Sequence, residues 1–299
     1  MIDLHVHTTN SDGRLTEIET LKKAQRIGLT AIAITDHNTC EAYEKLKKIN
    51  IKEMYAGELV KGCEFNTIVN NVPIELLGYD IDTDFIQANL RKYYLPFRDL
   101  NIYETNLLIQ RCIDLGLTIE KENIRYDEEK EYGNRGVHRE ITKHEENKKF
   151  LDEKSWKDPH YFSINFIGRP GTPFFIDTSN LIPDYRDVVN FIRNSGGKVF
   201  IPHVFKYKEK SLEVLKTLLD EKCLDGIECY HSSYSKENER YLKKLCETRG
   251  LYMSGGTDTH GREDVVLGLG DGSMRIPDEI LMKWHSYDRN KKIQYDEGR

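Results

Sequence analysis

The chain has 299 residues, of which 38% are hydrophobic and 31% charged, and its formal net charge is -6. This length allows one large domain or two smaller ones, and the composition is typical of a soluble globular protein. The acidic balance argues against an extended basic groove for nucleic acid but does not exclude a short nucleic-acid end. Six scattered cysteines without a C-x-x-C pair, no membrane-spanning apolar run and no signal peptide predict a cytoplasmic protein.

The first expected strand covers residues 2–6 and runs directly into a group of metal-binding residue types. Because side chains alternate between the faces of a strand, His5 and His7 point to the same side. Asp12 follows on the next loop. Two imidazoles and a nearby carboxylate indicate a metal site, which needs further ligands from elsewhere in the chain.

Strands and helices are then expected to alternate. Thr16 and Glu19 form a capping-box pattern and Gly28 a stop signal, so residues 16–27 are expected to form a helix. Residues 30–34 form a short apolar run, typical of a strand buried on both faces, and a helix is expected at 40–49. This order predicts right-handed crossovers between parallel strands.

Residues 54–64 are expected to form a third strand, paired in a hairpin with 69–79 across Asn70 and Asn71. The strand pattern then stops, and polar helical segments follow at 85–115, 118–123 and 135–149. We therefore expect an inserted, mostly helical subdomain at 84–159 within a barrel formed by 1–83 and 160–299. The later elements are expected as a loop with a short strand at 163–177, helices at 185–194, 212–221 and 237–248, strands at 198–201, 226–230 and 251–254, and a peripheral tail after about Trp284.

Possible metal ligands recur at the carboxyl ends of five expected strands. In parallel α/β barrels and sheets these ends meet on one face, where loops build active sites. Each residue alone also has an ordinary structural explanation: Asp36 as a helix cap, for example, or His203 as a loop histidine. Their joint placement indicates a metal centre built from His5, His7, Asp36, His37, Glu64, His203, Asp258 and His260.

In their order along the chain, these motifs resemble those of the PHP (polymerase and histidinol phosphatase) family, and most closely its stand-alone bacterial phosphoesterases. The motifs are His5-x-His7 with Asp12, Thr35-Asp36-His37, Gly62-Cys63-Glu64, Pro202-His203 and Gly256-Thr257-Asp258-Thr259-His260-Gly261. The resemblance implies an α/β fold, a distorted (β/α)7 barrel, that holds three divalent metal ions. Mixed imidazole and carboxylate ligands suit Mn, Fe or Zn.

The resemblance also implies a role for each residue. One ion would be held by His5, His7, Glu64 and Asp258, a second by Glu64, His138 and His203, and a third by Asp12, His37 and His260. Asp36 would orient a ligand imidazole. A hydroxide bridging two ions would attack phosphorus. Arg135 and Arg169 are the expected phosphate clamp. Tyr234 stands where family members often have a histidine, so either His231 takes over that role or the contacts to the substrate differ from those of the family.

The sequence thus predicts a metal-dependent phosphoesterase that acts on small phosphate esters, either nucleotides or the 5′ phosphates of short oligonucleotides. Histidinol-phosphate phosphatase is the alternative enzyme, although nothing in the sequence indicates an imidazole-binding pocket. A non-catalytic PHP scaffold would have lost ligands, and here all nine expected positions carry one. A hydrolase of C–N bonds would need a lysine at a strand end, where none is found.

Overall fold

The structure is a computed structural model that describes residues 1–129, 131–262 and 264–286. The chain folds as two compact units. The barrel unit comprises Met1–Tyr93 and Ile182–Arg299, and the helical unit comprises Tyr94–Leu181. The sequence predicted the inserted subdomain at 84–159. Its predicted start lies 10 residues before the start of the helical unit, and its predicted end lies 22 residues before the end of that unit.

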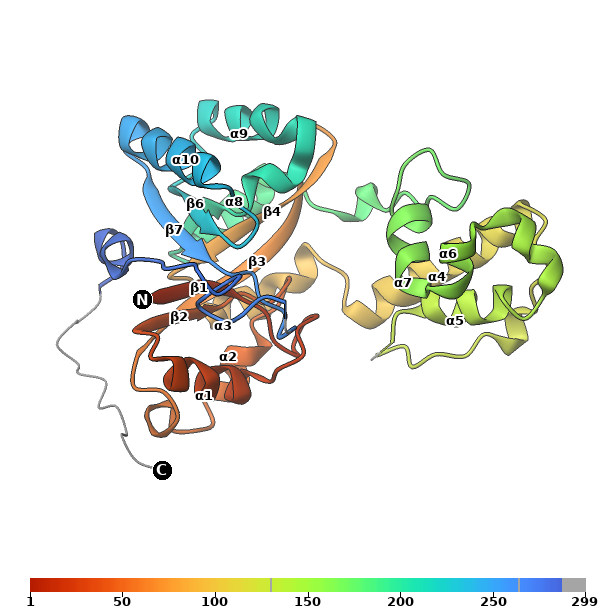
Figure 1. The fold of residues 1–299 in the computed structure, drawn as a ribbon, viewed down its shortest axis with the longest axis horizontal. Helices are drawn as coiled ribbons and strands as arrows, with labels where there is room; N and C mark the ends of the chain where they lie inside the picture. Colours follow the sequence, from red (N-terminus) through yellow and green to blue (C-terminus); the bar gives the residue numbers. More distant parts are fainter. Residues whose placement is uncertain (130, 263, 287–299) are drawn as a thin grey trace. The chain divides into compact units, whose positions relative to one another are not determined.

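Seven strands of the barrel unit form one sheet whose spatial order follows the chain order (Figure 1). The pairs β1–β2, β2–β3, β5–β6 and β6–β7 are parallel, whereas β4 is antiparallel to both β3 and β5. The strands are β1 (Ile2–Val6), β2 (Ala31–Ile34), β3 (Glu58–Val69), β4 (Val72–Tyr79), β5 (Lys198–Ile201), β6 (Gly226–His231) and β7 (Tyr252–Gly256).

The sheet curves until its first and last strands meet, which nearly closes a barrel. The Asp258 backbone N–H donates to His5 O at 2.9 Å, and the His7 N–H donates to Thr259 O at 3.0 Å. The backbones approach so closely here that a Cβ on Gly256 would lie 2.2 Å from His5 Cβ. Only glycine fits this position. The expected distorted (β/α)7 barrel is confirmed.

Helices pack on the outside of the strands; α8, for instance, contacts β3 and β5, and α10 contacts β6 and β7 (Figure 1). The start expected for α1 is confirmed, because Thr16 and Glu19 cap it reciprocally and Gly28 ends it with φ 76°. The helices of this unit are α1 (Glu17–Ile27), α2 (Glu41–Leu46), α3 (Thr83–Asn89), α8 (Tyr185–Asn194), α9 (Ser211–Asp220) and α10 (Lys236–Arg249), with 3₁₀ turns η1 (Ile51–Glu53), η2 (Leu90–Lys92), η7 (Val204–Lys210) and η8 (Asp278–Lys283).

Aromatic side chains fill the barrel. Trp284 is buried with its ring centroid 5.3 Å from that of Tyr79 and 5.0 Å from that of Phe200. The Trp284 indole N–H donates to Met253 O at 3.0 Å, which satisfies its polar atom. The Tyr79 hydroxyl donates to Leu4 O at 2.7 Å. Trp284 is thus part of the core. The tail was expected to be peripheral after about Trp284, and from residue 287 onward it lies outside the described residues.

The helical unit has its own hydrophobic core. Phe162 and Phe174 are fully buried in it, with ring centroids 5.1 Å apart. The prediction of a short strand within 163–177 is wrong. A π-helix, η5 (Ser163–Ile167), begins there directly after α7 (Pro159–Phe162) and keeps Phe166 against this core. The other elements are α4 (Phe97–Asp114), α5 (Gly133–Ile141), α6 (Glu153–Lys157) and α7 (Pro159–Phe162), with 3₁₀ turns η3 (Lys121–Asn123), η4 (Glu145–Phe150) and η6 (Ser179–Leu181).

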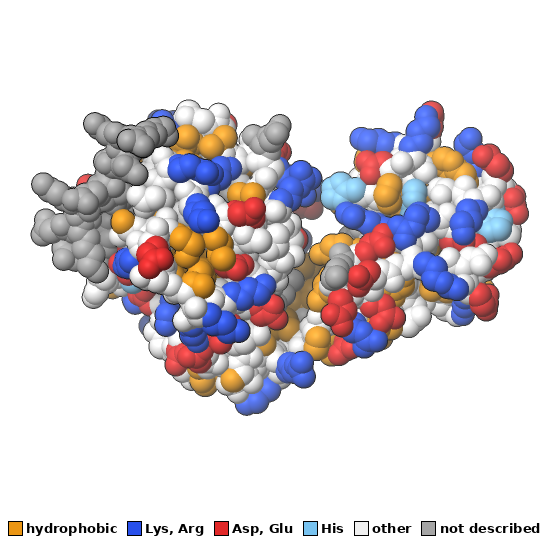
Figure 2. Space-filling view, turned by 90° about the horizontal axis from the view of Figure 1, so that it is seen from below, with side chains coloured by type: hydrophobic (Ala, Val, Ile, Leu, Met, Phe, Trp, Pro, Cys, Tyr) orange, Lys and Arg blue, Asp and Glu red, His pale blue; other side chains and the backbone are white. Residues whose placement is uncertain are grey.

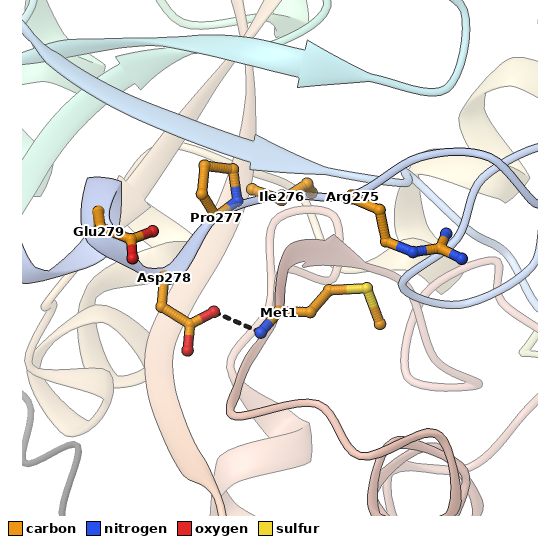
Figure 3. Close-up of a pocket in the computed structure, with 6 residues that line it drawn as sticks. All are labelled: Met1, Arg275, Ile276, Pro277, Asp278 and Glu279. Atoms are coloured by element: carbon orange, nitrogen blue, oxygen red, sulfur yellow. Dashed lines mark ion pairs between the residues drawn. The ribbon is translucent and has the colours of Figure 1, made fainter.

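The surface carries charges of both signs. On the face drawn in Figure 2, Lys and Arg side chains are interspersed with Asp and Glu side chains. The whole chain has 44 Lys and Arg and 50 Asp and Glu residues. A pocket of about 430 Å³ lies beside Met1. Figure 3 shows its lining, in which the Met1 amine pairs with Asp278. None of the residues expected as metal ligands lines this pocket. Among the described residues, no helix is both long and apolar enough to cross a membrane.

Candidate metal centre

The carboxyl ends of the parallel strands bring the expected ligands of the first ion together. His5, His7, Glu64 and Asp258 each offer a ligand atom, and these four atoms lie within 4.8 Å of one another. Glu64 Oε2 is 3.1 Å from both His5 Nε2 and His7 Nε2. Asp258 Oδ1 is 3.2 Å from His7 Nε2. Two carboxylates thus face two imidazoles across one small space.

A second group adjoins the first and contains the residues expected to hold the third ion. Asp12, His37, His260 and His7 again offer ligand atoms within 4.8 Å of one another. Asp12 Oδ2 lies 3.2 Å from His260 Nε2, and Asp12 Oδ1 lies 3.8 Å from His37 Nε2. His7 belongs to both groups, with Nε2 facing the first and Nδ1 facing Asp12 at 3.7 Å.

A third group contains a residue that the sequence analysis missed. Glu64 and His37 form it together with Glu75, which lies in the middle of β4. His203 Nε2 lies between the two glutamates, 3.0 Å from Glu64 Oε1 and 3.2 Å from Glu75 Oε2. Glu64 therefore faces His203 with one oxygen and the first group with the other, as expected of a bridging ligand.

Backbone conformation helps to place two of these side chains. Asp258 has φ 55° and His203 has φ 27°, a region that non-glycine residues adopt rarely and at some energetic cost. Both residues follow the end of a parallel strand. The chain turns sharply there and directs both side chains into the barrel mouth.

Several buried polar atoms of this site have no hydrogen-bond partner among the described residues. His5 Nε2, both ring nitrogens of His7 and His37 Nδ1 are buried, and none has a hydrogen-bond partner. Buried polar atoms are nearly always paired, so each such nitrogen needs an explanation. A neutral imidazole nitrogen with a free lone pair next to carboxylates is a ligand of transition metals. The residues therefore fit divalent ions.

Glu228 on β6 is a further buried carboxylate that the sequence analysis left without a role. Its Oε1 accepts from His5 Nδ1–H at 2.9 Å, and its Oε2 accepts from the His203 backbone N–H at 2.7 Å. A hydrogen bond at Nδ1 fixes the tautomer, so His5 presents its Nε2 lone pair to the first group. Glu228 thus orients one ligand and the backbone of another.

Asp36 has a different role from the one expected. Its carboxylate accepts hydrogen bonds from the Thr8 N–H at 2.7 Å, the Thr8 hydroxyl at 2.6 Å and the Ser11 hydroxyl at 2.6 Å. These contacts hold the loop that follows β1 and carries Asp12. Glu228, rather than Asp36, accepts an N–H from the ring of the expected ligand His5.

The charges of the centre shift its pKa values strongly. Burial alone would raise the pKa of Glu64, but the surrounding imidazoles, His5 first, hold it well below its usual range. Burial works against charged imidazoles, yet the adjacent carboxylates raise the pKa of His7 to about 10 and that of His203 to about 9. Without metal, protons thus balance the carboxylates, and divalent ions would replace them.

His231, expected to be catalytic, contacts a candidate ligand. Its Nε2 is 3.3 Å from Asp258 Oδ2, and its Nδ1 accepts from the Ser233 N–H at 3.1 Å. Because Nδ1 is an acceptor, the ring proton resides on Nε2 and is donated to Asp258. Burial lowers the pKa of His231, so the ring is neutral at pH 7. Asp258 Oδ2 also pairs with Lys206.

The remaining expected site residues belong to the helical unit. There the His138 Nε2–H donates to Ser155 O at 2.7 Å, and burial lowers the pKa of His138. Arg135 is part of α5, and Arg169 follows η5. The three ligand groups described above lie in the barrel unit. The role of His138 as a metal ligand and the role of Arg135 and Arg169 as a phosphate clamp therefore stay predictions.

The barrel gathers buried imidazoles and carboxylates at the carboxyl ends of its strands, an arrangement typical of a metal-dependent enzyme. The PHP domain family model matches residues 3–194, nearly two thirds of the chain. The protein belongs to this family and is a hydrolase that acts on phosphate ester bonds.

Named relatives resemble the chain over most of its length. A 5'-3' exoribonuclease of Haemophilus influenzae is 26% identical, over 86% of this chain and 89% of the relative. A 3',5'-nucleoside bisphosphate phosphatase of Chromobacterium violaceum is 24% identical, over 87% of each chain. The solved structure of a metal-dependent phosphoesterase from Bifidobacterium adolescentis is 20% identical, with a TM-score of 0.66, over 94% of this chain and 96% of that one. This last likeness supports the fold.

Proposed function

We propose that this protein hydrolyses phosphate esters of nucleotides or short oligonucleotides that carry a 5′ phosphate, and that it uses three divalent ions. The observation that carries the proposal is the convergence of three adjoining ligand groups on Glu64 and His7. No protein nucleophile is required in such a site. The names of the two relatives, which act on RNA ends or on nucleoside bisphosphates, support the substrate class.

The described residues suggest how the ions would be held. The first ion fits His5, His7, Glu64 and Asp258, and the third fits Asp12, His37 and His260. For the second ion the barrel unit offers His203 and Glu75 beside Glu64, and His138 is the further predicted ligand. When bound, divalent ions lower the pKa of water to near neutrality and offset the charge of phosphoryl oxygens.

The chain's own residues prepare the site for this chemistry. Glu228 holds His5 in the tautomer that directs its Nε2 inward, and His231 donates to Asp258. Asp36 fixes the loop that carries Asp12. These contacts fix the positions of the ligand side chains and so preorganise the site.

The test is a turnover assay of Mn-loaded protein with four classes of substrate: nucleoside 3′,5′-bisphosphates, 5′-phosphorylated oligoribonucleotides, the same oligomers with a 5′ hydroxyl, and histidinol phosphate. We expect phosphate or nucleotide release from the first two classes and loss of release in chelator. Preference for histidinol phosphate would favour the alternative enzyme. No release from any class, with metal bound, would contradict the proposal.

A further inference from the structure

Lys206 is a cation that directly contacts the metal centre of the barrel unit. It lies in η7, three residues after His203, and its ammonium group pairs with Asp258 Oδ2. Among the described Lys and Arg side chains, no other forms an ion pair with a residue of the three ligand groups. The Lys206 side chain is 44% exposed.

The two oxygens of Asp258 have different surroundings. Oδ1 faces the ligand nitrogens, 3.2 Å from His7 Nε2 and 3.4 Å from His5 Nε2. Oδ2 faces Lys206 and His231, the latter at 3.3 Å. Asp258 can therefore bind an ion through Oδ1 while Oδ2 keeps its contact with Lys206. This arrangement would keep the ammonium group beside the centre in metal-loaded protein.

An ammonium group has three N–H donors and no acceptor. The pair with Asp258 uses one donor of Lys206. Among the described residues its ammonium group has no second hydrogen-bond partner, which leaves its other donors for a ligand. Glu64 and Glu75 add negative potential at this position. Because bound divalent ions would offset these carboxylates, the loaded site would favour an anion there.

We propose that Lys206 binds a non-bridging oxygen of the phosphoryl group of the substrate while it holds Asp258. This inference rests on the proposed function and names the phosphate-binding cation within the barrel unit itself. Charge-assisted hydrogen bonds to phosphate are among the stronger polar contacts in proteins. Lys206 acts as a substrate-binding residue in addition to the arginines predicted in the helical unit.

A purely structural role for Lys206 would give a different pattern of effects. If Lys206 only oriented Asp258, its loss would weaken metal binding. His231 donates to the same oxygen, so the carboxylate stays oriented in a Lys206→Met variant. The variant also removes a positive charge next to the ion. Metal affinity should therefore stay the same or increase, while phosphate affinity falls.

The experiment has two calorimetric titrations on the full chain: Mn into metal-free protein, and inorganic phosphate into Mn-loaded protein. For Lys206→Met we expect phosphate to bind about tenfold or more weakly, with Mn affinity unchanged or higher. Lys206→Arg should retain most phosphate affinity. Lys210→Met, which removes an exposed lysine of the same segment paired with Glu213, is the matched control and should leave both titrations unchanged.

Two results would overturn the proposal: phosphate affinity of Lys206→Met within twofold of the parent, or a loss of Mn affinity of tenfold or more. Unfolding temperature, measured in parallel, verifies that the variant is folded. Failure of the proposed function gives a different result, since Mn-loaded parent protein would then neither bind phosphate nor release it from any substrate. That result overturns both proposals, whereas equal binding by parent and variant overturns the role of Lys206 alone.

Discussion

At the scale of single residues, the centre depends on which imidazole nitrogens keep a lone pair. Glu228 accepts from His5 Nδ1–H, which leaves Nε2 free to bind an ion. Ser233 donates to Nδ1 of His231, so that ring instead donates its Nε2–H to Asp258. Two histidines of one site thus have opposite tautomers, and neighbouring groups determine each.

Glu228→Gln tests this orienting role. The amide still accepts from His5 with one atom, but its NH₂ group faces the His203 backbone N–H, a donor, where a carboxylate oxygen accepted before. We expect Mn affinity to fall about 10- to 100-fold, measured by titration of metal-free protein. Glu247→Gln on the exposed side of α10 is the control. Unchanged Mn affinity in Glu228→Gln would show that the contact does not orient the site.

The pH dependence of stability follows from His7 and His203. Their pKa values rise to about 10 and about 9 in the folded metal-free protein, against about 6.5 when unfolded. Their stabilisation is complete below pH 6.5 and is lost as the pH rises through 9 and 10. We expect the free energy of unfolding of chelated protein to fall between pH 7 and 10, measured by urea denaturation.

Mn-loaded protein serves as the comparison for the pH experiment. Bound ions require neutral imidazoles, so the fall with pH should be reduced or absent in loaded protein. Mn affinity itself should increase over the same range, because fewer protons remain to be displaced. A flat stability profile for chelated protein would refute the protonated state of these two imidazoles.

At the scale of elements, the reversed direction of β4 explains why Glu75 was not predicted as a ligand from the sequence. Glu64 pairs with Leu77 across the β3–β4 hairpin, so Glu75, two residues away on β4, lies diagonally on the same face. The barrel ligands predicted from the sequence followed the carboxyl ends of expected parallel strands. Glu75 instead lies in the middle of an antiparallel strand, and its place beside Glu64 in the expected hairpin could have indicated it.

Glu75→Ala tests whether β4 contributes to the second ion. With Glu64 and His203 left in place, we expect the first and third ions to bind normally. The number of tightly bound Mn ions should fall by about one, measured by elemental analysis after dialysis. Glu58→Ala, a partly buried glutamate at the start of β3, is the control. An unchanged metal count would remove Glu75 from the ligand set.

Local sequence patterns predicted much of the fold and part of the site. Alternation along β1 placed His5 and His7 on one face, and the capping box defined the start of α1. Glu228 could not be assigned, because its partner His5 is distant in sequence and a buried acid in an apolar strand has no periodic signal. The π-helix at Ser163–Ile167 depends on tertiary packing of Phe162 and Phe166, which overrides local propensity.

At the scale of the whole molecule, two units have separate cores. Phe162 is fully buried in the core of the helical unit, so Phe162→Ala should destabilise that unit by about 3–5 kcal/mol. We expect faster amide hydrogen exchange in α4 and α5, with unchanged exchange in β1 and β7. Val214→Ala in α9, buried in the barrel unit, is the reciprocal control. Equal acceleration in both units would indicate one cooperative core.

The barrel brings ligands from the two ends of the chain to one place, and metal binding there is the basis of every functional inference. The most direct measurement is an anomalous difference map from a crystal soaked in Mn. We expect peaks within bonding distance of Glu64, in the space between His5, His7 and Asp258, and a further peak beside Asp12, His37 and His260. A well-ordered barrel with no peak in contact with Glu64 would contradict the metal centre and the phosphoesterase mechanism built on it.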